Sequence, residues 1–250
     1  LQAVCAVLIF SFDPLFLDHL LRSQLDLPFT LFFTLGIYFF FTGLKKKKYL
    51  FWSHFFWGAA FATRFFPIFV LIYVYLLVVI IFRKKSFLSV FLISSLFVPL
   101  IYLISHISFF VYHPSIIEFL RHKKWMLAWF TGTPIVFGNI WRNIFTGTYI
   151  DSVGKLVSNE HWIILLPIIS VLSMSSLIPI FFKQHEKETK ILYGLVMGYL
   201  LYLTVATGGL QKFLMPIYPL MILLTVDVLS FLYSIIDTWK KRIMLRSKAK

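Results

Sequence analysis

The chain has 250 residues, of which 60% are hydrophobic and 20% aromatic, and its mean hydropathy is +0.86. Soluble domains are closer to half apolar, and the excess here forms long runs, so the composition argues against a soluble globular protein. A net charge of +14 would suggest nucleic acid as the partner of a soluble protein, but these basic residues gather at the ends of apolar runs, where they orient membrane helices. We therefore expect membrane lipids as partners, and no nucleic acid.

Long apolar stretches without Gly or Pro, and no alternating pattern, predict helices rather than a barrel. We predict an all-α, polytopic transmembrane protein of about eight spans that forms one domain over residues 1–250. Residues 1–105 hold five amino-terminal spans, 106–160 an outer loop with interfacial helices, and 161–250 three spans and a basic cytoplasmic tail. The predicted spans are 1–12, 27–44, two helices within 49–82 that turn near Arg64, 86–105, 161–182, 190–208 and 213–236.

The first span is short because Leu1 already lies inside an apolar run. This start predicts that the first helix is incomplete and that the chain is truncated at its amino terminus. The single cysteine, Cys5, excludes an intrachain disulfide and a multi-cysteine metal site.

The segment after the first span carries three charges at helical spacing. Asp18, Arg22 and Asp26 lie at i, i+4 and i+8, which places them along one face of a helix. Asp13 precedes a proline and predicts a helix N-cap, and Pro28 predicts that this helix ends near Asp26. Charges between two membrane spans are costly, so we interpret the segment as a short surface helix that contributes to a substrate site.

The basic residues predict the orientation of the spans. If the spans alternate, sixteen of the 24 Lys and Arg residues fall on one side of the membrane and eight on the other. The side with sixteen should be cytoplasmic, and it includes the carboxy terminus. Abundant Phe, Ile and Lys indicate an AT-rich microbial source, so we expect an integral protein of a prokaryotic plasma membrane.

The connection from His106 to Glu160 is the least regular part of the pattern. Its apolar piece from Trp125 to Trp141 could suggest a ninth span, but Gly, Pro and Asn residues interrupt it. A ninth span would also move the basic tail to the outside. We predict an outer loop with interfacial helices anchored by Trp125, Trp129 and Trp141.

Three cations predicted on the outer side could surround one anionic group. Arg22, Arg64 and Lys212 combine the planar fork of arginine, which suits phosphate, with the point charge of lysine. A lipid phosphate at the membrane surface is the candidate ligand. The alternative for each cation alone is snorkelling toward water or pairing with a neighbouring acid.

Other polar residues give weaker signals. His113 and His122 lack the i, i+4 spacing and the paired carboxylates of a metal site. Asp227 lies inside the last span, where an acid is usually paired or functional, but nearer the predicted inner end. The chain has no GxSxG, Walker or GxGxxG pattern, so soluble-type nucleotide chemistry has no support.

Several short motifs follow one another in a recognisable order. They are Phe12-Asp13-Pro14, Arg22-x-x-x-Asp26, Gly58-Ala59-Ala60-Phe61-Ala62-Thr63-Arg64 and Gln211-Lys212-Phe213-Leu214-Met215-Pro216-Ile217-Tyr218-Pro219. Together they resemble the membrane glycosyltransferases of the C-type fold, especially the group with the protein O-mannosyltransferases and the aminoarabinose transferase of lipid A.

The resemblance implies a polyprenyl-phosphate-linked sugar donor, a lipid, glycan or protein acceptor, and transfer on the non-cytoplasmic face. Arg22 and Asp26 match a pair that supports the donor phosphate, and Arg64 falls at the family's Lys/Arg position. Lys212 replaces the usual Arg of the late motif, with Phe213 for Tyr. The general base of such enzymes is an acid of the first outer loop, expected before Leu1. Some members use a divalent metal and others do not, and this sequence has no dedicated metal motif.

Two other classes of function remain as alternatives. A transporter or lipid flippase should carry charged or helix-breaking residues near the middle of several spans, often with inverted repeats. Here the polar residues concentrate on one predicted face and no repeat is evident, which favours the enzyme. The third interpretation is a scaffold subunit without activity.

Overall fold

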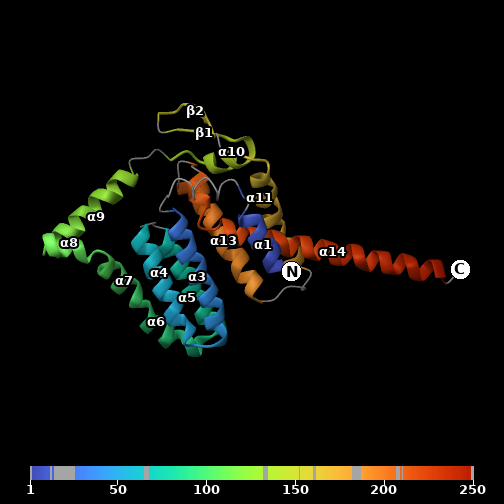
Figure 1. Cartoon of the computed structure of the whole chain (residues 1–250), viewed down its shortest axis with the longest axis horizontal. Coiled ribbons are helices and arrows are strands. Elements are labelled where there is room, and N and C mark those ends of the chain that lie inside the picture. The colour runs from blue at the N-terminus through green and yellow to red at the C-terminus, as the bar shows by residue number, and fades with distance from the viewer. Residues whose placement is uncertain are drawn as a thin grey trace.

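The computed structural model describes residues 2–11, 13, 26–64, 68–131, 135–151, 153–159, 162–181, 187–206, 209 and 211–248. The described chain is almost entirely helical (Figure 1). Asp18 and Arg22, two of the predicted site residues, lie outside the described residues, as do Glu160 and His161.

The apolar helices follow the predicted order of spans. Within the described residues, four helical segments are long and apolar enough to cross a membrane. They are α3 (Asp26–Lys45), Lys85–Ser105, α13 (Lys187–Ala206), and Tyr218–Lys241 within α14 (Tyr218–Lys248). The segment Lys85–Ser105 joins η1 (Lys85–Phe87), α6 (Leu88–Ser95) and α7 (Phe97–Ser105). Shorter apolar helices are α1 (Gln2–Ser11), α4 (Tyr49–Thr63), α5 (Ile68–Arg83), α11 (Leu165–Ser175) and α12 (Leu177–Phe181). These helices confirm the prediction of an all-α polytopic membrane protein.

The connection between α7 and α11 consists of short elements. They are α8 (Ile107–Tyr112), α9 (Ile116–Thr131), α10 (Asn139–Thr146) and an antiparallel hairpin of β1 (Thr148–Ile150) and β2 (Leu156–Ser158). In the hairpin, which the sequence did not predict, Thr148 lies opposite Ser158. None of these elements is among the candidate spans of the described chain.

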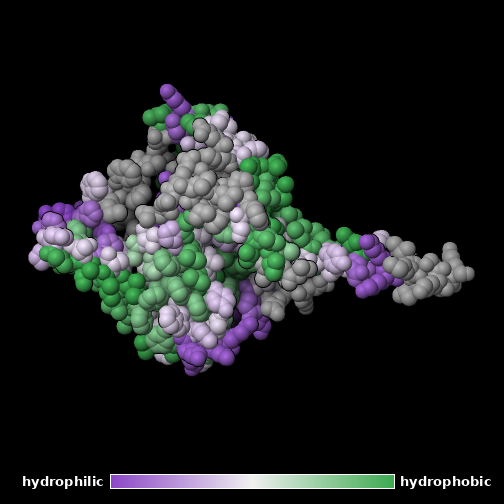
Figure 2. Space-filling model, viewed as in Figure 1, coloured by the Kyte–Doolittle hydropathy of each residue, from purple (hydrophilic) through white to green (hydrophobic). Residues whose placement is uncertain are grey.

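The helices define two ends of the bundle. A short turn joins α3 to α4, so the start of α3 and the end of α4 lie together, and α13 packs against α5 in the opposite direction (Figure 1). We call the end with Asp26, Arg64 and Lys212 the site end. The opposite end, with Lys45, Arg83 and Lys187, is the lysine end. Figure 2 shows hydrophilic side chains at the lysine end and apolar side chains over α6 and α7.

Small residues bring α3 and α4 into close contact. A Cβ atom at Gly36 would lie 2.0 Å from Cδ1 of Trp57, so only glycine leaves room for the indole. The Ser53 hydroxyl donates a hydrogen bond of 2.8 Å to the Gly36 carbonyl, and both residues are buried. Lipid tails are as apolar as the helices, so close packing and such hydrogen bonds hold membrane helices together.

Pro28 does not keep the residues before it out of a helix, as its predicted role required. Helix α3 begins at Asp26, so Pro28 lies in its first turn, while the predicted helix before it lies outside the described residues. The first N–H groups of a helix have no partner within the helix, so a proline there costs no hydrogen bond. Asp26 is therefore at the acidic start of a membrane helix, where the helix dipole favours a negative charge.

Candidate functional site

A buried ion pair joins two helix ends at the site end. The guanidinium of Arg64, directly after α4, pairs with the carboxylate of Asp26 at the start of α3. The side chains are 16% and 7% exposed, respectively. Because each charge is largely removed from water, each depends on the other for compensation. The pair therefore fixes the end of α4 against the start of α3.

Arg64 is held by backbone as well as side-chain interactions. It adopts an extended conformation, with φ of −151° and ψ of 118°, and its N–H donates to the Ala60 carbonyl at 3.0 Å. Burial lowers the pKa of the Arg64 guanidinium from its ordinary value. An arginine is nevertheless protonated at any physiological pH, so this site retains a permanent positive charge.

A second cation shares an aromatic ring with Arg64. The Cζ atom of Arg64 and the Nζ atom of Lys212 each lie 5.7 Å from the centroid of the Phe213 ring. Both separations are within the range of cation–π attraction. Burial, and secondly the positive charge of Arg64, lower the pKa of the Lys212 ammonium. No carboxylate of a described residue lies within 4.0 Å of Lys212, so an anion between these cations would be favoured.

The segment that carries Lys212 is anchored from two sides. The buried hydroxyl of Tyr199 in α13 donates to the Phe213 carbonyl at 3.1 Å. The Asn143 side chain of α10 donates to the Gly209 carbonyl at 2.9 Å. A helix on one side and the connection on the other thus position Lys212.

The Asn143 contact belongs to a network of asparagines. Asn159 donates to the Asn143 side-chain oxygen at 2.9 Å. Asn139 both donates to the Ile150 carbonyl, at 2.8 Å, and accepts from the Ile150 N–H, at 2.9 Å. Asn139 and Asn143 are almost completely buried, so these bonds replace water and hold the hairpin, α10 and Gly209 together.

Close packing also restricts Gly209 itself. Its φ is +81°, in the left-handed region that glycine adopts readily. A Cβ atom at this position would lie 2.7 Å from the carbonyl carbon of Asn139. Gly209 thus permits both the backbone turn and the approach of α10 to the Lys212 segment.

A further acid is buried at the same end. The hydroxyl of Tyr218, the first residue of α14, donates a hydrogen bond of 2.7 Å to the Asp13 carboxylate, and neither residue is exposed. Asp13 follows α1, so this bond joins the end of α1 to the start of α14. Asp13 was predicted only as a helix cap, although a lone acid after an apolar run is a signal of a buried polar contact.

An apolar cavity lies beside these charged residues. Its volume is about 630 Å³, and side chains of α1, α3 and α14 line it. Ser11, Leu27 and Pro219 contribute to its wall, and they are close neighbours in sequence of Asp13, Asp26 and Tyr218. From there the lining continues through Val7, Leu31 and Leu223, which are largely exposed. The cavity is therefore suited to a hydrocarbon chain that enters from the bilayer.

The histidines of the connection lie elsewhere. His113 pairs with Glu118 at 3.4 Å, and both side chains are more than half exposed. The ring of His106 accepts a hydrogen bond of 2.8 Å from Lys123. His106 and His113 flank α8, and their partners lie in α9, away from α10 (Figure 1). Among the described residues, no three His, Cys, Asp or Glu side chains gather closely enough to hold a metal ion.

Comparison with known proteins gives one match. Residues 1–109 match the family of dolichyl-phosphate-mannose-protein mannosyltransferases. No curated protein and no solved structure matches the chain. The matched part contains Asp13, Asp26 and Arg64, and it supports the resemblance to membrane glycosyltransferases of the protein O-mannosyltransferase type.

Proposed function

We propose that the protein transfers a sugar from a polyprenyl-phosphate donor to an acceptor hydroxyl at the site end of the bundle. The match of residues 1–109 supports a mannosyltransferase-type membrane glycosyltransferase. The observation that carries the more specific proposal is the position of Arg64 and Lys212 on one aromatic ring, with an apolar cavity whose wall includes Leu27, the sequence neighbour of the Arg64 partner Asp26.

The two cations stabilise the leaving group. In the transfer, the acceptor oxygen forms a bond to the anomeric carbon of the sugar, and the bond from that carbon to the phosphate oxygen breaks. Negative charge then accumulates on the polyprenyl phosphate that leaves. Arg64 and Lys212 are already partly desolvated and need little rearrangement to meet this charge, which is the condition under which electrostatic stabilisation is strongest.

Asp26 acts through Arg64. Its carboxylate holds the guanidinium at the end of α4, and a positioned fork offers its remaining donors to a phosphate in fixed directions. Asp26 is thus a positioning residue in this proposal. Arg22 and Asp18 retain the roles predicted from the sequence, as further ligands on the donor side.

The apolar cavity receives the lipid chain of the donor. It adjoins α1, α3 and α14, and its lining is mainly apolar apart from the hydroxyl side chains of Ser11, Thr30 and Thr34. A polyprenyl chain has no polar groups, so binding there removes apolar surface without stranding a hydrogen-bond donor. The lipid can enter and leave sideways while its phosphate stays at the level of Arg64.

Two carboxylates at the site end already have partners: Asp26 pairs with Arg64, and Asp13 accepts a hydrogen bond from Tyr218. Among the described residues, no group of three His, Cys, Asp or Glu side chains could hold a metal ion there. A carboxylate deprotonates the acceptor hydroxyl, as in the family that the sequence resembles.

The sidedness of transfer follows from the basic residues. The lysine end carries Lys45 to Lys48 and Arg83 to Lys85, so the rule that cytoplasmic loops are rich in Lys and Arg assigns this end to the cytoplasm. The site end would then lie on the non-cytoplasmic side, and the carboxy terminus in the cytoplasm.

Binding of a sugar-free product tests the proposal. The full-length protein in detergent should bind a polyprenyl phosphate at least about tenfold more tightly than the polyprenol without phosphate. Lys212→Gln should weaken binding of the phosphate and leave binding of the alcohol unchanged. Equal affinity for phosphate and alcohol in the wild-type protein would contradict the proposal.

A further inference from the structure

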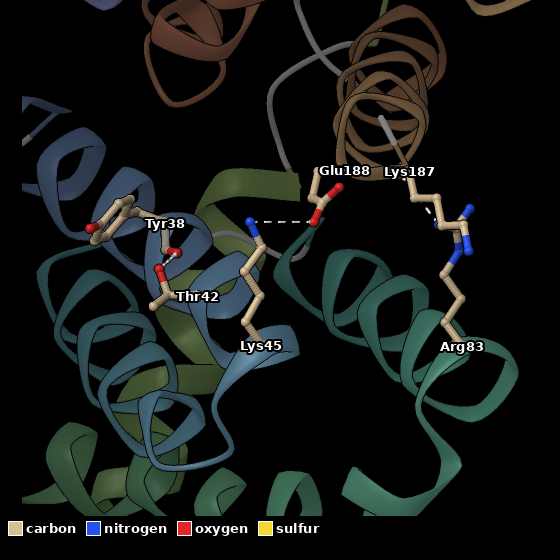
Figure 3. A network of polar contacts seen from close by, with 6 residues as sticks. All are labelled: Tyr38, Thr42, Lys45, Arg83, Lys187 and Glu188. Carbon is tan, nitrogen blue, oxygen red and sulfur yellow. Dashed lines mark hydrogen bonds and ion pairs between the residues drawn. The ribbon is translucent and has the colours of Figure 1, made fainter. Parts of the chain in front are cut away.

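A polar cavity of about 610 Å³ lies at the lysine end, far along the helices from the site just described. Three helix ends form it: the last residues of α3, the last residues of α5 and the first turn of α13. Figure 3 shows Lys45 and Glu188 facing each other across this space and Arg83 extending from α5 toward Lys187.

The cavity wall is strongly basic. Among the described residues, five cations and a single carboxylate line it, namely Lys45, Arg83, Lys84, Lys187, Lys190 and Glu188. Five positive charges against one negative charge leave a net charge of +4. Like charges this close repel one another, so an anion in the cavity would reduce the electrostatic repulsion that otherwise destabilises the folded chain.

The described polar contacts of this wall neutralise little of its positive charge. Lys45 and Glu188 are 3.8 Å apart, and the lysine side chain is 70% exposed, so their attraction is weak. Arg83 donates to the Lys187 carbonyl at 3.3 Å, which uses one of its five donors. No carboxylate of a described residue lies within 4.0 Å of Arg83 or Lys190.

The helix dipoles also favour an anion in this cavity. Lys45 and Arg83 end their helices, where the dipole favours a cation. Lys187 and Lys190 instead lie in the first turn of α13, where the dipole disfavours cations and favours anions. Orientation of the spans explains basic residues at this end, but it does not require them to converge on one cavity.

Apolar residues in the same wall indicate the kind of anion. Leu44 and Ile191 line the cavity beside the cations, and the Phe82 side chain at its edge is 84% exposed. An exposed phenylalanine next to arginine and lysine is typical of the boundary between bilayer and water. A soluble phosphate would use only the cations, whereas a phospholipid also has glycerol and acyl groups for the apolar side chains.

We propose that this cavity binds the phosphodiester headgroup of an anionic phospholipid in the adjacent leaflet. Arg83 and the lysines in the first turn of α13 bind the phosphate from one side, Lys45 closes the opposite side, and the acyl chains extend past Phe82. One bound lipid thereby joins the ends of α3, α5 and α13. The site is independent of the chemistry proposed for the other end of the bundle.

Native mass spectrometry of the full-length protein, titrated with phosphatidylglycerol, tests the site. The double variant R83Q/K190Q should weaken binding about tenfold or more. The matched control K46Q/K48Q removes two charges from the same end outside the cavity and should change binding less than about threefold. Phosphatidylcholine should bind no better to the wild-type protein than to the double variant.

Several results would overturn the proposal. Equal losses in the two double variants would show a diffuse charge effect. Competition by millimolar inorganic phosphate would assign the cavity to a soluble anion. If R83Q/K190Q does not fold, thermal unfolding of the wild-type protein tests the site instead. Phosphatidylglycerol should raise its melting temperature more than phosphatidylcholine does. This increase should be larger at low salt than at high salt. Equal shifts with both lipids would refute the site.

Discussion

The carboxylate of Asp26 and the guanidinium of Arg64, 38 positions apart in sequence, form a buried ion pair between the start of α3 and the end of α4. The pair does two things at once. It closes the site end of the helical hairpin, and it presents a permanent cation beside Lys212. Because both side chains are largely buried, the ion pair should be coupled strongly to folding.

Breaking this pair should therefore destabilise the protein. Asp26→Asn removes the carboxylate that pairs with the buried Arg64 and should lower the free energy of unfolding by about 3–5 kcal/mol. The double variant Asp26→Leu with Arg64→Met should recover most of this loss. Denaturant unfolding in micelles measures both. The matched control is Asp237→Asn, which removes an exposed pair with Lys241 and should have no measurable effect. If the double variant loses as much stability as Asp26→Leu and Arg64→Met lose in sum as single variants, this coupling is contradicted.

The bond between Tyr218 and Asp13 should also contribute to stability. Tyr218→Phe removes a buried donor from a carboxylate and should cost about 1.5–3 kcal/mol. Tyr233→Phe is the control, because Tyr233 is in the same helix but 72% exposed. The melting temperatures of the two variants, measured by thermal unfolding, compare these effects. Equal melting temperatures would mean that the Asp13 contact does not hold α1 against α14.

The turn before Lys212 should tolerate no side chain. Gly209 and Gly154 have nearly the same φ, +81° and +80°, so alanine imposes similar backbone strain at both. At Gly209 the new Cβ would also lie 2.7 Å from Asn139, whereas at Gly154 nothing lies within 4 Å. Gly209→Ala should therefore lower the melting temperature more than Gly154→Ala. It should also weaken polyprenyl-phosphate binding, because the segment of Lys212 must move. Identical effects of the two substitutions would show that α10 does not press on this turn.

Binding of the lipid phosphate should depend on pH through Lys212. Burial lowers the pKa of this ammonium, so it loses its charge at a lower pH than an ordinary lysine. The charge that attracts phosphate is present below this pKa and is lost as the pH rises through it. Affinity for polyprenyl phosphate should consequently fall on the alkaline side, and Lys212→Arg should abolish this fall because arginine keeps its charge. Titration of affinity between pH 7 and about 10.5 checks this, and an unchanged profile in the arginine variant would contradict it.

A substitution at Arg22 tests whether the segment before α3 contributes to sugar transfer. Arg22→Ala in the full-length protein should abolish sugar transfer and leave membrane insertion intact, because the change removes a proposed phosphate ligand without altering a span. Insertion is read from membrane fractions and transfer from labelled product. Normal turnover of a lipid-phosphate sugar by this variant would count strongly against a role for Arg22.

The spans could be predicted because each is a long, predominantly apolar run. The turn near Arg64 followed from length, since residues 49–82 as one straight helix would be far longer than the bilayer is thick. Short connections between antiparallel helices then bring Asp26, Arg64 and Lys212 to one end. This arrangement depends on counting spans and needs no knowledge of side-chain contacts.

The contacts that position the site could not be predicted in this way. Asp13 and Tyr218 are 205 positions apart, and no periodicity relates them. Asn139 and Asn143 occur in a connection where asparagine is common, so their burial against Gly209 becomes visible only in three dimensions. Pro28 was misread because a proline near a helix end can belong to either neighbour, and only the observed start of α3 decides.

The central claim is that the site end breaks the bond between sugar and lipid phosphate. Proteoliposomes with the full-length protein, supplied with polyprenyl-phosphate sugars and an acceptor extract, test it most directly by mass spectrometry of both products. We predict glycosylated acceptor and free polyprenyl phosphate in equal amounts. Intact donor that crosses the bilayer, with no polyprenyl phosphate released, would contradict the proposal and identify a flippase instead.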